Sequence, residues 1–425
     1  MQINLISHTS LQRLFVRYFL LHLFVASTAF SQAQQFTQPA YKLPDPLIDI
    51  NGKKVTNTRE WYARRKELLE IFSSQMYGQS PARPAAMTFK VFDNDNKALN
   101  GKAIRKQVTV YFTGKEDGPQ MDILIYLPNK SKQPAPVFVE LNFQGNQSVN
   151  ADPAIRLSKS WMAPKTRGTV DNHATDSSRG TTSKLFPVEK IIDRGYGIAT
   201  IYCGDLDPDF DDGFINGVQA MYPELQGRGD NFSTIAAWAW GLSRAMDYFE
   251  TDKDINSKRV AVFGFSRLGK ATLWAGAKDE RFAMVISNES GAGGAKLFHR
   301  NIGEKIRRLN TVFPHWYCNN FRNYMDKDSI LPFDQHMIIA LVAPRPVYVA
   351  SALEDTNSDP EGEFQGAKAA EPVYKLFTKD GLPTDKWPAP NHPVMGQIAY
   401  HVRTGKHDVT DYDWSQYLDF ADKHL

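Results

Sequence analysis

The stretch RVAVFGFSRLGKATLWAGA, residues 259–277, joins two different patterns at a single serine. Its first part, RVAVFGF, is a short apolar run rich in valine and phenylalanine, which predicts a buried β-strand. Its second part, LGKATLWAGA, is typical of an α-helix. A serine at a sharp turn from a strand into a helix is the arrangement of a nucleophile elbow, in which small neighbours let the chain turn without a clash. Ser266 is therefore a candidate nucleophile.

The glycines around this serine depart from the usual elbow pattern. Gly264 lies two residues before Ser266, but Leu268 stands where the second glycine is expected, and Gly269 follows one position later. A serine at this position can instead cap the helix that begins after it. The local sequence leaves both roles open, so partner residues must decide between them.

A serine nucleophile needs a histidine to take its proton and a carboxylate to orient that histidine. In α/β-hydrolases these residues follow the serine in the order acid, then histidine. His407 is favoured because it follows the last expected strand, GQIAYHVRTG, in a loop that returns to the carboxyl edge of the sheet. His401 lies inside that strand and is expected to be packed. The alternative for His407 is a solvated loop histidine.

Two carboxylates compete for the third role. Glu289 ends the expected strand AMVISNES, and Asp355 follows the next one, RPVYVASALE. Asp355 holds the commoner acid position of this fold, but either side chain could reach His407. Each could also cap a helix at a strand end. The pattern leaves the choice between the two acids open.

The order of the expected elements predicts the fold class. From Gly197 onward strands and helices alternate, which indicates parallel strands joined by crossover helices. We therefore expect an α/β-hydrolase fold, a mostly parallel central sheet with helices on both faces. Earlier β-rich runs at residues 107–112, 121–128 and 135–143 are expected to be antiparallel. An amphipathic helix over residues 58–78 is expected to pack across the sheet.

The first 33 residues have the layout of a secretory signal peptide. Arg13 and Arg17 precede the apolar run YFLLHLFVASTAF, which small and polar residues follow. The run is shorter than the ~20 apolar residues of a membrane span, so an uncleaved anchor is the less favoured reading. We therefore expect a secreted or periplasmic protein.

The rest of the chain, residues 34–425, is expected to form a single catalytic domain. Long polar or aromatic inserts near 145–185 and 291–336 leave from strand ends, where α/β sheets bind ligands, and we expect them to serve the site. Cys203 and Cys318 show no metal-ligand spacing and are expected to be buried thiols.

The composition narrows the possible partners. The chain has 425 residues, with 42% hydrophobic and 23% charged residues and a net charge of +3, which is typical of a soluble globular protein. The basic residues are scattered, which argues against binding to nucleic acid or to an anionic membrane surface. No later segment is long and apolar enough for a membrane span. We expect a monomer that acts on a small or carbohydrate substrate.

Several long motifs, in one order, resemble a known family. They are GFSRLGK, NESGAGG, FPHWYCNNF, LPFDQHMIIALVAPRP and GKHDVTDYDW. They are similar to those of the glucuronoyl esterases of carbohydrate esterase family 15, and the resemblance extends from about residue 45 to the C-terminus. The family is similar in fold to α/β-hydrolases and typically carries the elbow as G-x-S-R-x-G-K, which accounts for the displaced glycine.

This resemblance implies the chemistry. The family cleaves the ester between 4-O-methyl-glucuronic acid on xylan and lignin alcohols, so the expected partner is glucuronoxylan or a lignin-carbohydrate ester. It uses no metal, and we expect no cofactor. Another carbohydrate serine esterase, such as an acetylxylan esterase, and a non-catalytic carbohydrate-binding relative are the alternatives.

The resemblance also implies roles for individual residues. Ser266 matches the nucleophile and His407 the base. Glu289 matches the usual family acid and ranks first for this role, and Asp355 matches a second acid of many bacterial members, so both are kept. Arg267 would face the developing oxyanion with its backbone N–H and its guanidinium, and donors of this kind typically contribute ~3 kcal/mol each.

Substrate-binding positions follow in the same way. Lys270 and Glu304 match polar residues that bind the sugar. Asn357 stands where the family usually has a tryptophan, so stacking worth about 1 kcal/mol on the uronate ring would be lost. Trp316, in the second insert, is a candidate to replace that stacking, and core packing is the alternative for it.

Overall fold

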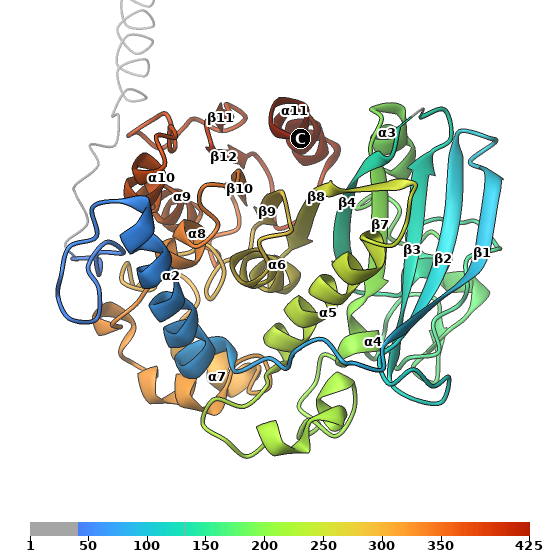
Figure 1. Ribbon diagram of the computed structural model, residues 1–425, viewed down its shortest axis with the longest axis horizontal. Coiled ribbons are helices and arrows are strands. Elements are labelled where there is room, and N and C mark those ends of the chain that lie inside the picture. Colours follow the sequence, from blue (N-terminus) through green and yellow to red (C-terminus); the bar gives the residue numbers. More distant parts are fainter. Residues whose placement is uncertain (1–40, 132) are drawn as a thin grey trace, which may run out of the picture. The chain divides into compact units, whose positions relative to one another are not determined.

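A ten-stranded β-sheet forms the centre of the structure, a computed structural model that describes residues 41–131 and 133–425 (Figure 1). In sheet order its strands are β1 (Thr88–Ala98), β2 (Ala103–Tyr111), β3 (Gln120–Pro128), β7 (Gly197–Tyr202), β4 (Ala135–Asn142), β8 (Ile255–Phe265), β9 (Met284–Asn288), β10 (Val347–Ala352), β12 (Ile398–Arg403) and β11 (Val394–Met395). A separate small sheet pairs β5 (Thr169–Val170) with β6 (His173–Ala174). The expected signal peptide lies outside the described residues.

The central strands are parallel, as the sequence predicts. From β7 through β4, β8, β9 and β10 to β12, each neighbouring pair is parallel, whereas β1, β2 and β3 add antiparallel strands at one edge and β11 adds one at the other. The antiparallel expectation is confirmed for residues 107–112 and 121–128. It is wrong for residues 135–143, because the chain after β4 crosses over through the first insert before it enters β7, which restores the strand direction.

Helices connect the strands. They are α2 (Thr58–Phe72), the π-helical turn η1 (Ser73–Tyr77), α3 (Val188–Asp193), α4 (Cys203–Leu206), α5 (Thr234–Phe249), α6 (Arg267–Lys278), α7 (Ile306–Val312), α8 (His336–Ala340), α9 (Pro360–Ala369), α10 (Glu371–Leu376) and α11 (Asp411–His424). Short 3₁₀ turns are η2 (Asn146–Ser148), η3 (Asp176–Ser178), η4 (Val218–Met221), η5 (Pro223–Leu225), η6 (Asn319–Tyr324) and η7 (Asp328–Ile330).

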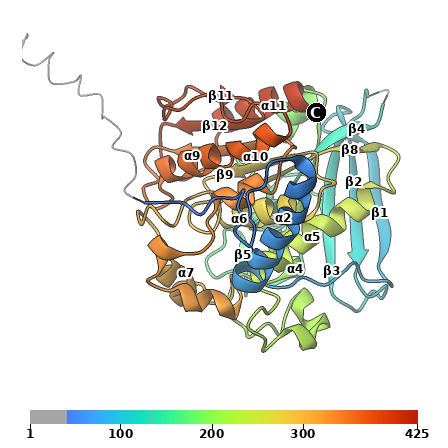
Figure 2. The ribbon, with the colours of Figure 1, turned by 60° about the vertical axis from the view of Figure 1, so that its left-hand side comes forward.

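A hydrophobic core lies on each face of the sheet, because successive side chains of a strand point to opposite faces. On β4, Val137 and Val139 belong to one core and Phe138 to the other. The first core includes side chains of α2, α5, α6, α8, α9 and α10, and the second includes side chains of α3 and α11 (Figures 1 and 2). Helices on both faces of the sheet confirm the predicted fold class.

The expected helix near the start of the chain is present as α2 with the following turn η1. Arg65 of α2 donates a hydrogen bond of 2.6 Å to the carbonyl of Ala277 in α6, so α2 packs against α6 within the first core. Residues Leu43–Leu425 form one compact unit. Over residues 41–131 and 133–425, no helix combines the length and the apolar character that crossing a membrane requires. Cys203 and Cys318 are both free and buried, as expected.

Candidate active site

The turn from β8 into α6 is a strained elbow centred on Ser266. This serine has φ 57° and ψ −130°, a conformation that residues with a side chain rarely adopt and that is common at functional sites. Its backbone N–H donates to the carbonyl of Asn288 at the end of β9. Its side chain makes no capping hydrogen bond to α6. Ser266 thus stands at the N-cap position of α6, but its side chain does not cap the helix.

Two glycines allow the close contact of strand and helix at this elbow. A Cβ atom on Gly264 would lie 2.3 Å from Thr272 Oγ1 and 2.4 Å from the carbonyl oxygen of Leu268. A Cβ atom on Gly269 would lie 2.9 Å from the Gly264 carbonyl oxygen and 3.0 Å from Ser290 Cβ. The second close approach thus falls at residue 269, which explains why the glycine is displaced by one position from the usual elbow pattern.

The carboxyl ends of β9, β10 and β12 bring Glu289, Asp355 and His407 together. His407 Nδ1 lies 2.6 Å from Asp355 Oδ2 and 3.0 Å from Glu289 Oε2, so both candidate acids contact the same ring nitrogen. The imidazole packs beside the ring of Phe265, with 4.6 Å between ring centroids. Because Phe265 directly precedes Ser266, this contact places His407 next to the elbow.

The hydroxyl of Ser266 and the imidazole of His407 both belong to the described part of the chain, and the structure shows no direct hydrogen bond between them. Bonds between a nucleophile and its base are often long without substrate and tighten only in the complex. The side chain of His407 is 39% exposed, so it is open to an approaching substrate.

Arg403 holds Glu289 of this cluster in place, and the sequence patterns do not identify it. Its guanidinium lies 2.6 Å from Glu289 Oε1 and 2.9 Å from Asp413 Oδ2, and all three side chains are almost fully buried. The second oxygen of Glu289 accepts the backbone N–H of Asp408, next to His407. The sequence signal for Arg403 is its charge at the end of the expected strand GQIAYHVRTG.

The two acids act on the pKa of His407 in the same direction. Burial alone would lower this pKa, but the hydrogen bonds to Asp355 and Glu289 outweigh burial and raise it to about 9. Burial also works against the charged form of each acid. For Asp355 the hydrogen bonds with His407 and Ser358 prevail and the pKa is lowered, whereas for Glu289 burial prevails and the pKa is raised. Asp355 therefore holds its negative charge more firmly.

Arg267, the first residue of α6, is held over the site by an ion pair. Its Nη1 donates to Asp209 Oδ2 over 2.8 Å. The guanidinium lies over the rings of Phe143 and Trp316, at 5.4 Å and 5.3 Å from the ring centroids. Its Nε–H is buried and has no hydrogen-bond partner among the described residues. Asp209, from the loop after α4, is a second residue that the sequence patterns missed.

Lys270 lies one turn further along α6 and is buried. Its ammonium group donates two hydrogen bonds of 2.6 Å, to the backbone carbonyls of Ser290 and Ala292. Burial lowers its pKa, and the charge of Glu304 is the largest influence that opposes this effect. An ammonium group has three protons, so one remains for a further acceptor.

Trp316 is buried, with 3% exposure, and one face of its ring stacks on Phe313 with centroids 3.7 Å apart. Its indole N–H donates to Asp209. These contacts match the core-packing alternative for Trp316. Glu304 is linked to the position of the missing tryptophan, because its backbone N–H donates to the carbonyl of Asn357, an exposed residue.

Comparison with known proteins places this geometry in a family. The family model described as glucuronyl esterase, fungi, matches residues 197–378. The structure of a promiscuous CE15 esterase from a marine bacterial metagenome superposes with a TM-score of 0.86 at 51% sequence identity, covering 91% of this chain and 98% of that one. The glucuronoyl esterase from Solibacter usitatus gives a TM-score of 0.86 at 46% identity, covering 91% and 99%. The 4-O-methyl-glucuronoyl methylesterase 1 of Wolfiporia cocos is 34% identical, over 82% of this chain and 75% of its own length. The chain belongs to the glucuronoyl esterases of carbohydrate esterase family 15.

The acids and the imidazole of this glucuronoyl esterase could also be considered as metal ligands. One ligand atom from each of Glu289, Asp355 and His407 lies within 4.8 Å of the others. However, Arg403 already places a positive charge against Glu289, and His407 Nδ1 lies at hydrogen-bond distance from both carboxylates. These contacts suit a protonated Nδ1 oriented by two acids better than a bound cation.

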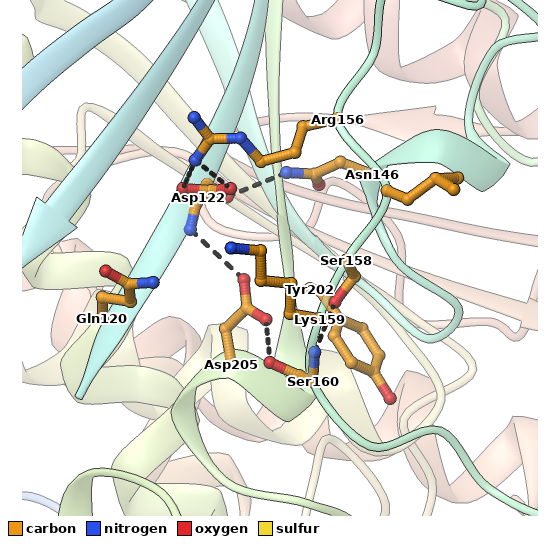
Figure 3. A pocket seen from close by; sticks show the side chains of 10 residues that line it. Gln120, Asp122, Asn146, Arg156, Ser158, Lys159, Ser160, Tyr202 and Asp205 are labelled. Carbon is orange, nitrogen blue, oxygen red and sulfur yellow. Dashed lines mark hydrogen bonds and ion pairs between the residues drawn. The ribbon is translucent and has the colours of Figure 1, made fainter. Parts of the chain in front are cut away.

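The first insert of this glucuronoyl esterase contacts β3 and α4 through polar side chains that range from half-buried to exposed (Figure 3). Arg156 pairs with Asp122 of β3, and Ser160 donates a 2.6 Å hydrogen bond to Asp205 of α4. Burial, together with the nearby Asp122, raises the pKa of Asp205 to about 7. A cavity of about 60 Å³ lies between these groups, and neither Ser266 nor His407 lines it. These polar contacts anchor the first insert on β3 and α4.

Proposed function

We propose that this enzyme hydrolyses the ester between glucuronic acid of glucuronoxylan and a lignin alcohol, with Ser266 as nucleophile. The observation that carries the proposal is the position of His407, which two carboxylates hold beside the elbow serine. Family membership supports the reaction, since relatives at 34% identity are named 4-O-methyl-glucuronoyl methylesterases.

The reaction runs in two halves. His407 Nε2 takes the proton of Ser266, and the serine oxygen attacks the ester carbonyl carbon to form a tetrahedral intermediate. Arg267 stabilises the oxyanion. The intermediate then collapses as protonated His407 gives its proton to the leaving alcohol oxygen, which leaves an acyl-enzyme. Water, deprotonated by His407, attacks this ester, and the serine oxygen leaves with the proton to give free uronate.

The substrate would be recognised through its sugar ring. The free proton of Lys270 is available to a sugar hydroxyl, and Glu304 lies close enough to Lys270 to act on its charge. Glu304 can accept a second hydroxyl. The loss of the family tryptophan at Asn357 weakens stacking on the ring and leaves the chemistry unchanged. One relative at 51% identity is described as promiscuous, so an acetyl ester is the second substrate to test.

The test compares ester classes with the purified chain. We expect hydrolysis of benzyl glucuronate and methyl glucuronate, with smaller rates on acetylated xylan and nitrophenyl acetate. Ser266→Ala should lower kcat by roughly 1,000-fold or more. Activity confined to acetyl esters would assign the chain to another class of carbohydrate esterase, and a fully active Ser266→Ala variant would remove the proposed nucleophile.

A second variant separates sugar recognition from chemistry. Lys270→Met should raise KM for glucuronate esters by about tenfold, as expected for one lost charge-assisted hydrogen bond, and leave nitrophenyl acetate hydrolysis within about twofold. Thermal denaturation serves as a control, since the variant also leaves the carbonyls of Ser290 and Ala292 without their donor.

The biological setting is part of the same proposal. Residues 34–425 act as a single catalytic domain, which the compact unit Leu43–Leu425 supports. The N-terminal segment directs export, so the enzyme works as a secreted or periplasmic monomer. Processing at about residue 33 can be checked by mass spectrometry of the exported protein, and the monomer by its hydrodynamic size.

A further inference from the structure

Asp209 connects the catalytic arginine to the second insert. One of its carboxylate oxygens, Oδ2, accepts the hydrogen bond from Arg267 at 2.8 Å. The other, Oδ1, accepts the indole N–H of Trp316 at 2.7 Å and lies 3.1 Å from His315 Nε2. Both oxygens of the carboxylate are therefore fixed, and each of them contacts a different part of the fold.

The ionised form of Asp209 is strongly held. Burial would raise its pKa, but the hydrogen bond with His315 and the charge of Arg267 prevail, and the pKa is lowered. The side chains of Arg267 and Asp209 are 33% and 22% exposed. Breaking this half-buried pair therefore costs more than breaking a fully exposed one, because it leaves a partly desolvated charge without compensation. Asp209 therefore stays charged and in place over the range in which an esterase works.

The ion pair with Asp209 accounts for only one of the five N–H donors of Arg267. Nη1 is taken by Asp209, whereas Nε–H is buried and has no partner among the residues that the structure describes. Buried donors are nearly always paired, and an exception requires an explanation. Arg267 directly follows Ser266 in the chain. Its unpaired Nε–H is suited to donate to the ester carbonyl oxygen, which becomes negative only during the reaction.

We propose that Asp209 is a positioning residue that fixes the guanidinium of Arg267 for the oxyanion. The inference rests on the proposed function, in which Ser266 attacks the ester carbonyl. The carboxylate of Asp209 offsets part of the positive charge beside the oxyanion. However, an arginine side chain has many rotamers, and ordering it during the reaction would cost free energy. A guanidinium that Asp209 already orients avoids this cost. Trp316 and His315 extend this support by holding Asp209 itself.

A double-mutant cycle tests the proposal. Asp209→Asn keeps the size of the side chain and removes its charge. We expect kcat to fall by about 10- to 100-fold, the range for a misplaced catalytic group, while KM changes by less than about threefold. In an Arg267→Met background, the same substitution should change kcat by less than about twofold, because the group that Asp209 positions is gone.

A matched control is available two residues away. Asp211 is exposed, and Asp211→Asn should leave kcat, KM and the melting temperature unchanged. Titration of the acyl-enzyme burst gives the fraction of active enzyme for each variant. A merely structural role for Asp209 predicts an equal loss in both backgrounds that follows the active fraction. That result, or an unchanged kcat in the single variant, would overturn the proposal.

The choice of substrates keeps the two proposals apart. The cycle is measured with benzyl glucuronate and with nitrophenyl acetate, since the oxyanion forms on either ester. If only nitrophenyl acetate is cleaved, the uronate specificity fails and the coupling of Asp209 to Arg267 is still measured. If Ser266→Ala retains full activity, the proposed mechanism fails, and the role of Asp209 fails with it.

Discussion

His407 Nδ1 lies 2.6 Å from Asp355 Oδ2, closer than its 3.0 Å distance from Glu289. Two acids on one ring nitrogen imply that either can orient the imidazole when the other is removed. We expect Asp355→Asn and Glu289→Gln each to lower kcat by about 10- to 100-fold. The double variant should lose roughly 10,000-fold, the loss typical of a triad without its acid.

These activities are measured on benzyl glucuronate with the active fraction determined for each variant. Equal activity of one single variant and the double variant would mean that only one acid serves the reaction.

The acids also set the pH dependence. The base must be neutral to accept a proton, and the pKa of His407 is raised to about 9, so kcat/KM should increase with pH between 7 and 9. Removing the charge of Asp355 takes away the largest contribution that raises this pKa. The rising limb of Asp355→Asn should therefore lie at lower pH than that of the wild type.

Initial rates corrected for spontaneous ester hydrolysis give the two profiles. A limb that moves to higher pH in Asp355→Asn would contradict the proposed electrostatic role of this carboxylate.

Arg403 should matter for stability as well as for activity. Arg403→Met leaves the buried carboxylates of Glu289 and Asp413 without their partner, and we expect the free energy of unfolding to fall by about 3–5 kcal/mol. The same substitution at Arg307, whose ion pair with Asp326 is exposed, is the control and should change the free energy of unfolding far less. Urea denaturation of the two variants compares these costs, and equal values would show that the buried pair is not special.

Restoring the family tryptophan should strengthen binding without changing the chemistry. Asn357 is exposed and holds Glu304 only through its backbone carbonyl, so Asn357→Trp keeps that contact. An added aromatic face worth about 1 kcal/mol corresponds to a KM for benzyl glucuronate about fivefold lower, with kcat within about twofold. Thr356→Trp places the same ring one residue away at another exposed position, and it should leave KM unchanged.

The sequence predicted the parts of the fold that depend on local pattern. The turn at residues 264–269 and the alternation after Gly197 follow from strand and helix signals that lie next to each other in the chain. The meeting of His407 with both acids follows from the same logic, because parallel strands end at one edge of the sheet. The family resemblance ranks Glu289 first, and the structure places Asp355 nearer to His407 Nδ1, at 2.6 Å against 3.0 Å for Glu289, a difference that no sequence pattern expresses.

Other features depend on contacts between distant segments. The run at residues 135–143 has the same β-rich pattern whether it is parallel or antiparallel, and only the crossover after it decides the direction. Arg403 and Asp209 belong to no recognisable sequence motif, because each pairs with a side chain far away in the sequence. The sequence does not decide whether Trp316 stacks on substrate or packs in the core, because the burial of its side chain follows only from the fold.

The final helix α11 carries Asp413, which holds Arg403 and also lies 2.9 Å from the buried His401. One of the two acids that contact the base, Glu289, is thus supported through Arg403 by a carboxylate of α11. Full support of the base therefore forms only once α11 has packed on the sheet, which links catalytic activity to the completed fold.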